Sequence, residues 1–308
     1  MAEITAKLVS ELRAKTGCGM MECKKALVEA DGNFDNAIKV LRERGLNVAA
    51  KKQDRIAAEG VVDIAFNEAG NVAAMIEVNS ESDFVAKNES FKAFVKGILN
   101  VIIEKKPADV NALLSEEYSD GITVEAALKE QIFKIGEKIT IRRFIIVEGV
   151  LTSYIHGHGT TGVIVAFDAD EAAVKNPEFA AMTKNVALQV AAMNCLYVNK
   201  EAVPEEAVNE EKEVIVNTLK NDPKNANKPA NIIEKMVTGK LGKFYETYCL
   251  SEQLYVKDDS MTVAKYLENC SKELGGKVVL KQFYRYEKGE GLQKREDDLA
   301  AEVAKMIK

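Results

Sequence analysis

The chain has 308 residues, of which 47% are hydrophobic, so it can bury a sizeable core and is predicted to form two or three domains. Its formal charge is −6, and Lys and Arg are scattered along it, which disfavours direct binding to a nucleic-acid backbone. It has no charged-then-apolar leader and no run of about 18 apolar residues, so we expect a cytoplasmic protein with no membrane partner.

The cysteines and histidines are too few and too dispersed for a metal site. Only two histidines occur, and the five cysteines are widely spaced, with no CxxC pair among them: Cys18, Cys23, Cys195, Cys249 and Cys270. We therefore expect reduced cysteines, mostly in the core, and neither a metal nor a cofactor.

Residues 4–45 carry three apolar patterns with helical spacing. Glycine-containing breaks separate them at residues 16–19 and 31–32, and the third helix is expected to stop at Gly45. A polar, helix-compatible stretch at residues 51–55 follows and links the module to the rest of the chain. The sequence thus predicts a compact three-helix module over residues 1–55.

From residue 57 the apolar spacing becomes typical of strands. Two β-favouring runs at residues 61–66 and 72–78 flank a turn and predict a hairpin. A polar stretch leads from them to a helix at about residues 90–104. These elements define the first core subdomain, which we place at residues 56–144.

The same order recurs 88 residues later. A strand at 145–150, a Gly-rich turn, a second strand at 163–167 and a helix from about Pro177 follow one another, and Lys87, Asn88 and Phe91 map onto Lys175, Asn176 and Phe179. A weak internal duplication accounts for this. It predicts a second, similar α+β subdomain over residues 145–288, each with a small antiparallel sheet.

Three further elements complete the expected α+β fold. Charged helical patterns broken near Pro223 and Pro229 predict a helical hairpin inserted at about residues 187–240. A strand is expected at residues 278–287. A C-terminal helical module is expected at residues 289–308, with an amphipathic helix from Arg295.

One stretch, residues 157–162, matches the letters of a dinucleotide fingerprint, GxGxxG. That fingerprint requires a helix after it, whereas Val163 continues as a strand, so a hairpin turn is the favoured interpretation. His156 and His158 lack a third ligand nearby and are read as turn residues. The sequence contains no GxxxxGK[ST], GxSxG or HExxH motif, and we expect no covalent catalysis.

Two sets of apolar residues allow two interpretations each. Phe84 follows four polar or small residues where a strand passes into a helix; such a residue is more often part of the core, but an exposed Phe beside an acid is an interaction anchor. Met20 and Met21 are by the same reasoning core residues of the first module or part of a binding surface. Periodicity does not decide between these alternatives.

Two long motifs resemble the elongation factor Ts family. They are Thr16-Gly-Cys-Gly-Met-Met-Glu-Cys-Lys-Lys-Ala-Leu27 and Asn79-Ser-Glu-Ser-Asp-Phe-Val-Ala86. The similarity continues at residues 135–144, 153–157, 235–240 and 303–304, and so spans essentially the whole chain. Ser82 stands where the family often has Thr, and both residues carry a hydroxyl. Residues 185–229 match poorly.

The resemblance implies a nucleotide-exchange factor for elongation factor Tu, bound in its GDP and nucleotide-free states. Ser82, Asp83, Phe84 and Val85 would then disturb the magnesium and nucleotide site. Arg13, Met20 and Met21 of a UBA-like module (similar to ubiquitin-associated domains), with His156, would bind the partner. A homodimer within a heterotetramer is left open.

Two rival functions come from other classes. A UBA-like adaptor without exchange activity would not depend on Asp83 and Phe84. A nucleotide-using enzyme would bind a dinucleotide at Gly157.

Overall fold

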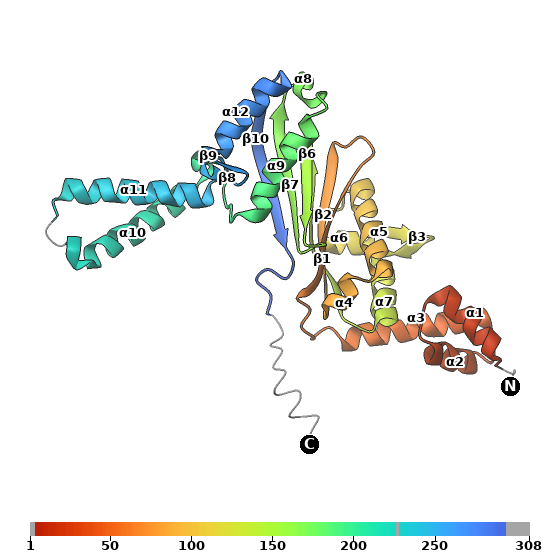
Figure 1. The fold of residues 1–308 in the computed structure, drawn as a ribbon. Helices are drawn as coiled ribbons and strands as arrows, with labels where there is room; N and C mark the ends of the chain where they lie inside the picture. The colour runs from red at the N-terminus through yellow and green to blue at the C-terminus, as the bar shows by residue number, and fades with distance from the viewer. Residues whose placement is uncertain (1–3, 226–227, 294–308) are drawn as a thin grey trace.

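The computed structural model describes residues 4–225 and 228–293, and two three-stranded antiparallel sheets form its centre (Figure 1). The first sheet has the strand order β1 (Glu59–Phe66), β2 (Val72–Ser80), β5 (Ile139–Glu148). The second has the order β10 (Val278–Glu287), β7 (Thr161–Ala169), β6 (Val150–His156). The predicted α+β class with small antiparallel sheets is confirmed.

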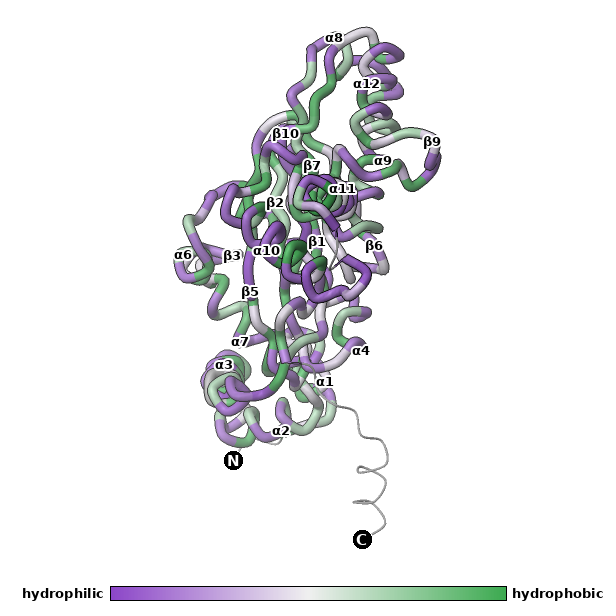
Figure 2. The backbone as a smooth tube through the Cα atoms, turned by 90° about the vertical axis from the view of Figure 1, so that its left-hand side faces the viewer, coloured by the Kyte–Doolittle hydropathy of each residue, from purple (hydrophilic) through white to green (hydrophobic). Residues whose placement is uncertain are grey.

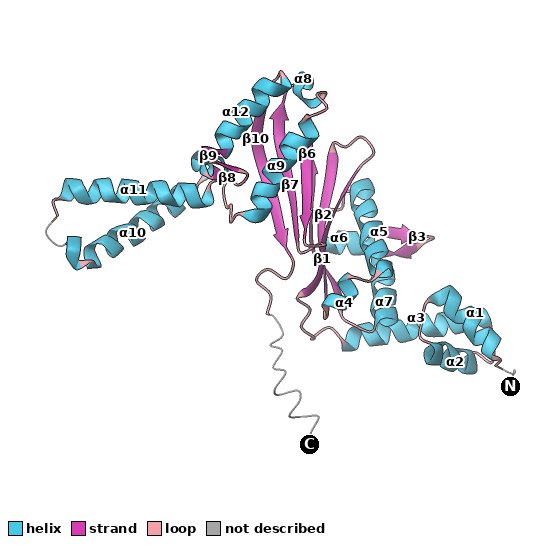
Figure 3. Cartoon of the chain, in the orientation of Figure 1, coloured by secondary structure: helices cyan, strands magenta, loops and turns pink. Residues whose placement is uncertain are grey.

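The two sheets pack face to face, with helices on their outer sides. Along β2, Ala74 and Ile76 face the core that includes α5 (Glu89–Lys105), while Ala73 and Met75 join residues of the second sheet in a separate core. Every residue of β2 is buried because both of its faces are covered. The strands consequently form the middle of the molecule in Figure 3, with α5 and α12 (Val263–Leu274) on opposite sides.

The N-terminal module contains the three predicted helices, α1 (Ala6–Thr16), α2 (Met20–Glu29) and α3 (Phe34–Lys51). The predicted end of the third helix at Gly45 was wrong, because α3 continues to Lys51. Gly45 is buried and faces Phe133 of α7 (Val124–Ile135), whose Cβ would be 3.4 Å from a Cβ added at Gly45. Packing against α7 thus outweighs the helix cost of a single glycine, about 1 kcal/mol.

The internal duplication extends further than the sequence pattern suggested. The offset of 88 relates α4 (Asp83–Ala86) to α8 (Glu171–Val174), and places α5 close to α9 (Phe179–Ala192). A second offset, of 139, relates β5 to β10 and also relates α7 to α12, two helices that the sequence did not predict. The change from 88 to 139 corresponds to 51 extra residues in the second copy, where the helical hairpin is inserted.

Several short elements were also not predicted from the sequence. In the first copy these are α6 (Val110–Ser115), β3 (Glu117–Ser119) and β4 (Ile122–Thr123), and in the second β8 (Leu254–Tyr255) and β9 (Asp258–Thr262). In both copies a two-stranded ribbon precedes a helix that starts after a threonine N-cap, Thr123 or Thr262.

The helical hairpin consists of α10 (Glu205–Asn221) and α11 (Ala230–Tyr248), and it projects away from the sheets (Figure 1). The predicted hairpin was confirmed, but its expected start near residue 187 lies inside α9. Figure 2 views the molecule from the side of the hairpin, with the N-terminal module at one end and α8 and α12 at the other.

The strand expected at residues 145–150 is two strands. Residues up to Glu148 belong to β5 and pair with β2 in the first sheet, and β6 of the second sheet begins at Val150. Gly149, at φ 132°, separates them. The subdomain boundary at residues 144/145 stays a prediction, and β5 runs through it.

The expected turn between β6 and β7 is formed by residues 157–160, while Gly162 lies in β7; the three glycines of residues 157–162 have structural roles. Gly157 has φ 58°, and Gly159 has φ 97° and accepts a hydrogen bond from the Val62 backbone N–H at 2.8 Å. Gly162 lies between the sheets, where an added Cβ would be 2.5 Å from Val62 Cγ1 and 3.0 Å from Met75 Sδ. Each glycine is therefore explained without a nucleotide.

Gly162→Ala is expected to lower the free energy of unfolding by about 1–3 kcal/mol, because the added methyl overpacks the core between the sheets. Denaturant unfolding measures this. The matched control is Gly239→Ala in α11, where nothing lies within 4 Å of the added Cβ. That change should be neutral or stabilising, by up to about 1 kcal/mol. Equal destabilisation by both changes would contradict the packing role of Gly162.

The C-terminal helix expected from Arg295 lies outside the described residues. Within residues 4–225 and 228–293 no helix is long and apolar enough to cross a membrane.

Candidate functional site

Phe84 is on the surface. It lies in α4, the single helical turn between β2 and α5, and its side chain is 77% exposed. The next residue, Val85, is 5% exposed and joins the core beneath α5. Of the two interpretations left open, the core role for Phe84 is wrong, because Val85 occupies that place. An exposed Phe beside an acid is suited to serve as an anchor in a contact with another macromolecule.

Asp83 carries its negative charge beside this ring. The Lys87 Nζ lies 2.7 Å from Asp83 Oδ2, and this hydrogen bond lowers the pKa of the Asp83 carboxyl below its usual value. Lys87 also lies 5.6 Å from the centre of the Phe84 ring. α4 thus presents an anion, a cation and an apolar surface together.

The segment before α4 is held by two glutamates. Ser82 donates to the Glu137 carboxylate twice, from its backbone N–H at 2.8 Å and from its hydroxyl at 2.6 Å. Glu81 accepts from the Lys138 backbone N–H at 2.6 Å and pairs with Arg55 at 3.2 Å. The start of α4 is thereby fixed to the turn between α7 and β5.

The second copy of the fold provides an internal comparison for Phe84. Its helix α8 has the same acid–lysine pair four residues apart, Glu171 with Lys175, and a buried third residue, Ala173. At the position of Phe84, however, it has Ala172. The large exposed ring is therefore not required to build this part of the fold.

Arg13, Met20 and Met21 gather at one end of the N-terminal module. Arg13 is in the last turn of α1, and the two methionines open α2 across the residue 17–19 loop. Arg13 is exposed, Met20 is 46% exposed and Met21 62%. The core interpretation of Met20 and Met21 is wrong; the core of the module is formed by other side chains, among them Leu12, Cys23 and Leu27.

His156 is the exposed last residue of β6. Its Nδ1 is 3.1 Å from the Tyr154 hydroxyl. The turn that follows is fixed to β1 of the first sheet by the hydrogen bond between Val62 and Gly159. Among the residues that the structure describes, no group of three His, Cys, Asp or Glu side chains could hold a metal ion.

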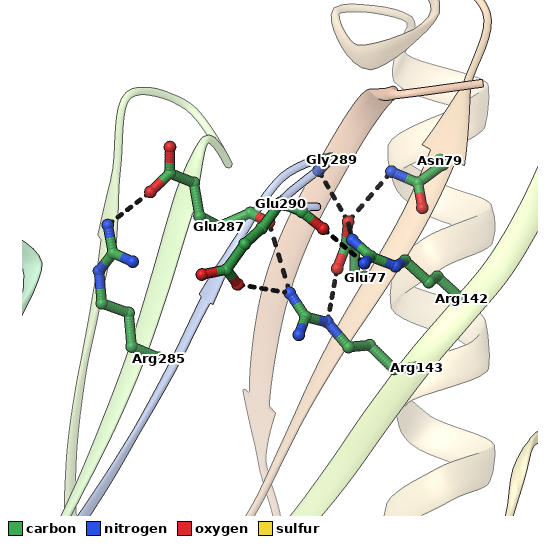
Figure 4. A network of polar contacts seen from close by, with 8 residues as sticks. All are labelled: Glu77, Asn79, Arg142, Arg143, Arg285, Glu287, Gly289 and Glu290. Carbon is green, nitrogen blue, oxygen red and sulfur yellow. Dashed lines mark hydrogen bonds and ion pairs between the residues drawn. The ribbon is translucent and has the colours of Figure 1, made fainter. Parts of the chain in front are cut away.

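A buried carboxylate, Glu77, connects the first sheet to the end of β10 (Figure 4). Its side chain is fully buried, and it accepts hydrogen bonds from Arg142 Nη1 at 2.9 Å, Arg143 Nε at 2.6 Å and the Gly289 backbone N–H at 2.8 Å. Burial raises the pKa of this carboxyl, but these bonds and one from Asn79 outweigh it, so the pKa of Glu77 is below its usual value. Glu77 is therefore ionised.

The same network fixes the chain that follows β10. Arg143 Nη2 lies 3.1 Å from Glu290 Oε2, and Lys288 pairs with Glu59. Gly289 has φ 69°, and an added Cβ would be 2.2 Å from the Ala58 carbonyl oxygen. The strand β10 and the first sheet consequently meet close to α4, and Lys288 contributes to the lowered pKa of Asp83.

Ser82 was among the predicted site residues, but its partner Glu137, the buried Glu77 and the arginines that pair with Glu77 were not. One signal was present: Glu77 stands in an otherwise apolar strand run, Ala73 to Val78, where an unpaired charge would be costly. The partners themselves are far away in the sequence.

An exposed aromatic on a fixed turn and exposed methionines on a separate module are typical of a protein that binds another protein. Comparisons with known proteins agree. The family model described as elongation factor TS matches residues 81–290.

Relatives match along the whole chain. The elongation factor Ts of Clostridioides difficile (strain 630) is 46% identical over 100% of both chains, and that of Syntrophotalea carbinolica is 44% identical over 99% of this chain and 100% of its own. That of Clostridium botulinum (strain Eklund 17B) is 42% identical over 99% of each. The chain belongs to the elongation factor Ts family, and its role is that of a translation elongation factor.

Proposed function

We propose that the chain binds elongation factor Tu carrying GDP and promotes GDP release by disturbing the magnesium and phosphate site, so that GTP can bind. One observation carries the proposal. α4 exposes Phe84 beside a charged Asp83 on a segment fixed by Glu81 and Glu137, where the duplicate copy has only Ala172. No covalent step is involved, and the factor needs no cofactor.

Linkage explains why such a site must act together with others. Nanomolar nucleotide binding corresponds to about −12 kcal/mol, and if the factor weakens nucleotide binding, the nucleotide weakens factor binding equally. A shift from mostly occupied to mostly empty partner requires roughly 5 kcal/mol of differential affinity. One aromatic side chain does not supply this alone.

Partner binding and nucleotide displacement are therefore assigned to separate surfaces of the protein. The UBA-like module, through Arg13, Met20 and Met21, and the second subdomain, through His156, bind the partner whether or not nucleotide is present. Asp83 and Phe84, with Ser82 and Val85 holding them, act only against bound magnesium and phosphate. Exposure of Arg13, both methionines and His156 supports their binding role.

Met20→Ala is expected to raise the Kd for elongation factor Tu about tenfold, because an exposed apolar anchor is lost. The maximal rate of GDP release should stay within about twofold, since α4 is untouched. Surface plasmon resonance gives the Kd, and release of fluorescent GDP at saturating factor gives the rate. Arg13→Ala should behave in the same way.

The matched control is Val28→Ala, which also truncates an exposed apolar residue of α2 but lies at the opposite end of that helix. If Val28→Ala weakened the complex as much as Met20→Ala, the binding surface would not be where we place it. A chain that binds elongation factor Tu but does not accelerate GDP release, with or without the Asp83 and Phe84 side chains, would favour the adaptor alternative. Titration with NAD tests the dinucleotide alternative at Gly157.

A further inference from the structure

We infer that Glu137 is a positioning residue for nucleotide exchange, which acts by holding Ser82 and thereby setting where Phe84 stands. The inference rests on the proposed function and adds a residue to it. Glu137 lies in the turn between α7 and β5, 55 residues from Ser82 in sequence. Within the described residues its carboxylate accepts hydrogen bonds from Ser82, and it makes none to Asp83 or Phe84. Its effect must therefore pass through Ser82.

The contact is reciprocal between two neighbouring segments. Glu137 accepts from the Ser82 backbone N–H, and Glu81 accepts from the Lys138 backbone N–H at 2.6 Å. Each segment thus supplies one carboxylate and one N–H to the other. Charge-assisted bonds of this kind are stronger and more directional than neutral ones. Two of them side by side restrict both translation and rotation of the segment before α4.

The linker from the N-terminal module joins the same contact. Arg55 pairs with Glu81, and Lys138 Nζ donates to the Arg55 backbone carbonyl at 2.9 Å. The position of α4 is consequently tied to the point where the N-terminal module enters the core. Docking by the module and action by Phe84 are thus connected by a short path of hydrogen bonds.

α4 needs such support because it is a single turn of four residues. A helix this short is not stable alone and depends on tertiary contacts. Val85 anchors it from below by burial, but one buried side chain leaves the turn free to rotate about that anchor. Ser82 is the N-cap residue, yet its hydroxyl makes no capping bond within α4 and donates to Glu137 instead.

The second copy of the fold makes the corresponding contact with one carboxylate, where the first copy uses two. There Asp170 stands at the position of Ser82; its carboxylate accepts from the Lys277 backbone N–H at 2.7 Å, and its own N–H donates to the Lys277 backbone carbonyl at 2.9 Å. Gly276 stands where the first copy has Glu137. One carboxylate is therefore enough to hold these two segments together in the fold. The second carboxylate, Glu137, occurs in the copy that carries the exposed phenylalanine.

The test measures GDP release from elongation factor Tu by the full-length chain with Glu137→Gln, which keeps the size of the side chain and removes its charge. The maximal release rate should fall roughly five- to tenfold, with the half-saturating concentration of elongation factor Tu–GDP within about twofold of the original. Glu125→Gln in α7, an exposed carboxylate that pairs with Lys129, is the matched control and should change neither.

Two further variants separate positioning from a loss of folded protein. Ser82→Ala removes only the 2.6 Å hydroxyl bond and should lower the maximal rate by roughly two- to threefold. In a Phe84→Leu background the effect of Glu137→Gln should shrink, because the residue it positions has changed. All rates are divided by the active fraction, taken from stoichiometric titration with elongation factor Tu.

An unchanged maximal rate for Glu137→Gln would overturn the inference. So would an equal fold-loss in the Phe84→Leu background, or a loss confined to the half-saturating concentration. If Phe84→Ala itself left GDP release unchanged, the proposed function would fail, and that result is distinguishable from the other three.

Discussion

Phe84→Ala is expected to lower the maximal rate of GDP release from elongation factor Tu by at least about tenfold, while the Kd of the nucleotide-free complex changes by less than about threefold. Phe84 makes no core contact that its loss would disturb, because it is 77% exposed and Val85 fills the core position. Its removal should affect the step in which the factor opposes bound nucleotide. Stopped-flow release of fluorescent GDP, with a separate affinity measurement, gives both quantities.

The matched control for this change is Leu254→Ala, which removes another exposed apolar side chain, 57% exposed, in β8 of the second copy. It should leave the release rate unaltered. An undiminished rate with Phe84→Ala would remove the direct role of α4. A fall in affinity equal to the fall in rate would make Phe84 a docking residue instead.

Glu77→Ala is expected to lower the free energy of unfolding by about 3 kcal/mol, within the range for breaking a buried ion pair by removing one partner. Two arginines and the Gly289 N–H would lose the carboxylate that they share. Glu77→Gln should cost less, because an amide oxygen still accepts one of these bonds. Denaturant unfolding at neutral pH measures both.

The contribution of Glu77 should also depend on pH. Its folded-state pKa is lowered, so the stabilisation is fully present above the unfolded-state pKa of about 4.3 and is lost as pH falls through the folded-state value. The difference in stability between the original chain and Glu77→Gln should therefore shrink in acid. Glu268→Gln, an exposed residue paired with Lys265, serves as control and should change little at neutral pH. A pH-independent difference would contradict an ionised Glu77.

Local sequence patterns predicted the elements whose apolar spacing is self-contained. The β1–β2 hairpin, α5, β7, the helical hairpin and β10 were found this way. The predicted α3 ended too early, at Gly45. The helix continues to Lys51 because it packs against Phe133, which lies in a helix 88 residues further along the chain. α7 and α12 were missed because their shared offset of 139 is visible only once the hairpin insertion is recognised.

The candidate site shows the same limit at the level of single side chains. Spacing could not tell whether Phe84 or Val85 enters the core, since adjacent residues at the start of a one-turn helix point in different directions. Family resemblance, not periodicity, favoured a surface role for Phe84. Arg142, Arg143 and Gly289, which bind Glu77, lie 65, 66 and 212 residues away from it, so no local pattern could indicate these partners.

The two copies of the fold differ in surface features that the shared strands do not require. When one architecture exists twice in a chain, changes at equivalent places can be tolerated in one copy while the other preserves the shared centre. One copy here has a bulky ring at α4, and the other has an alanine there and accommodates 51 additional residues elsewhere. Two copies of one strand arrangement thus give an asymmetric molecule, because their surfaces differ while their sheets have the same order of strands.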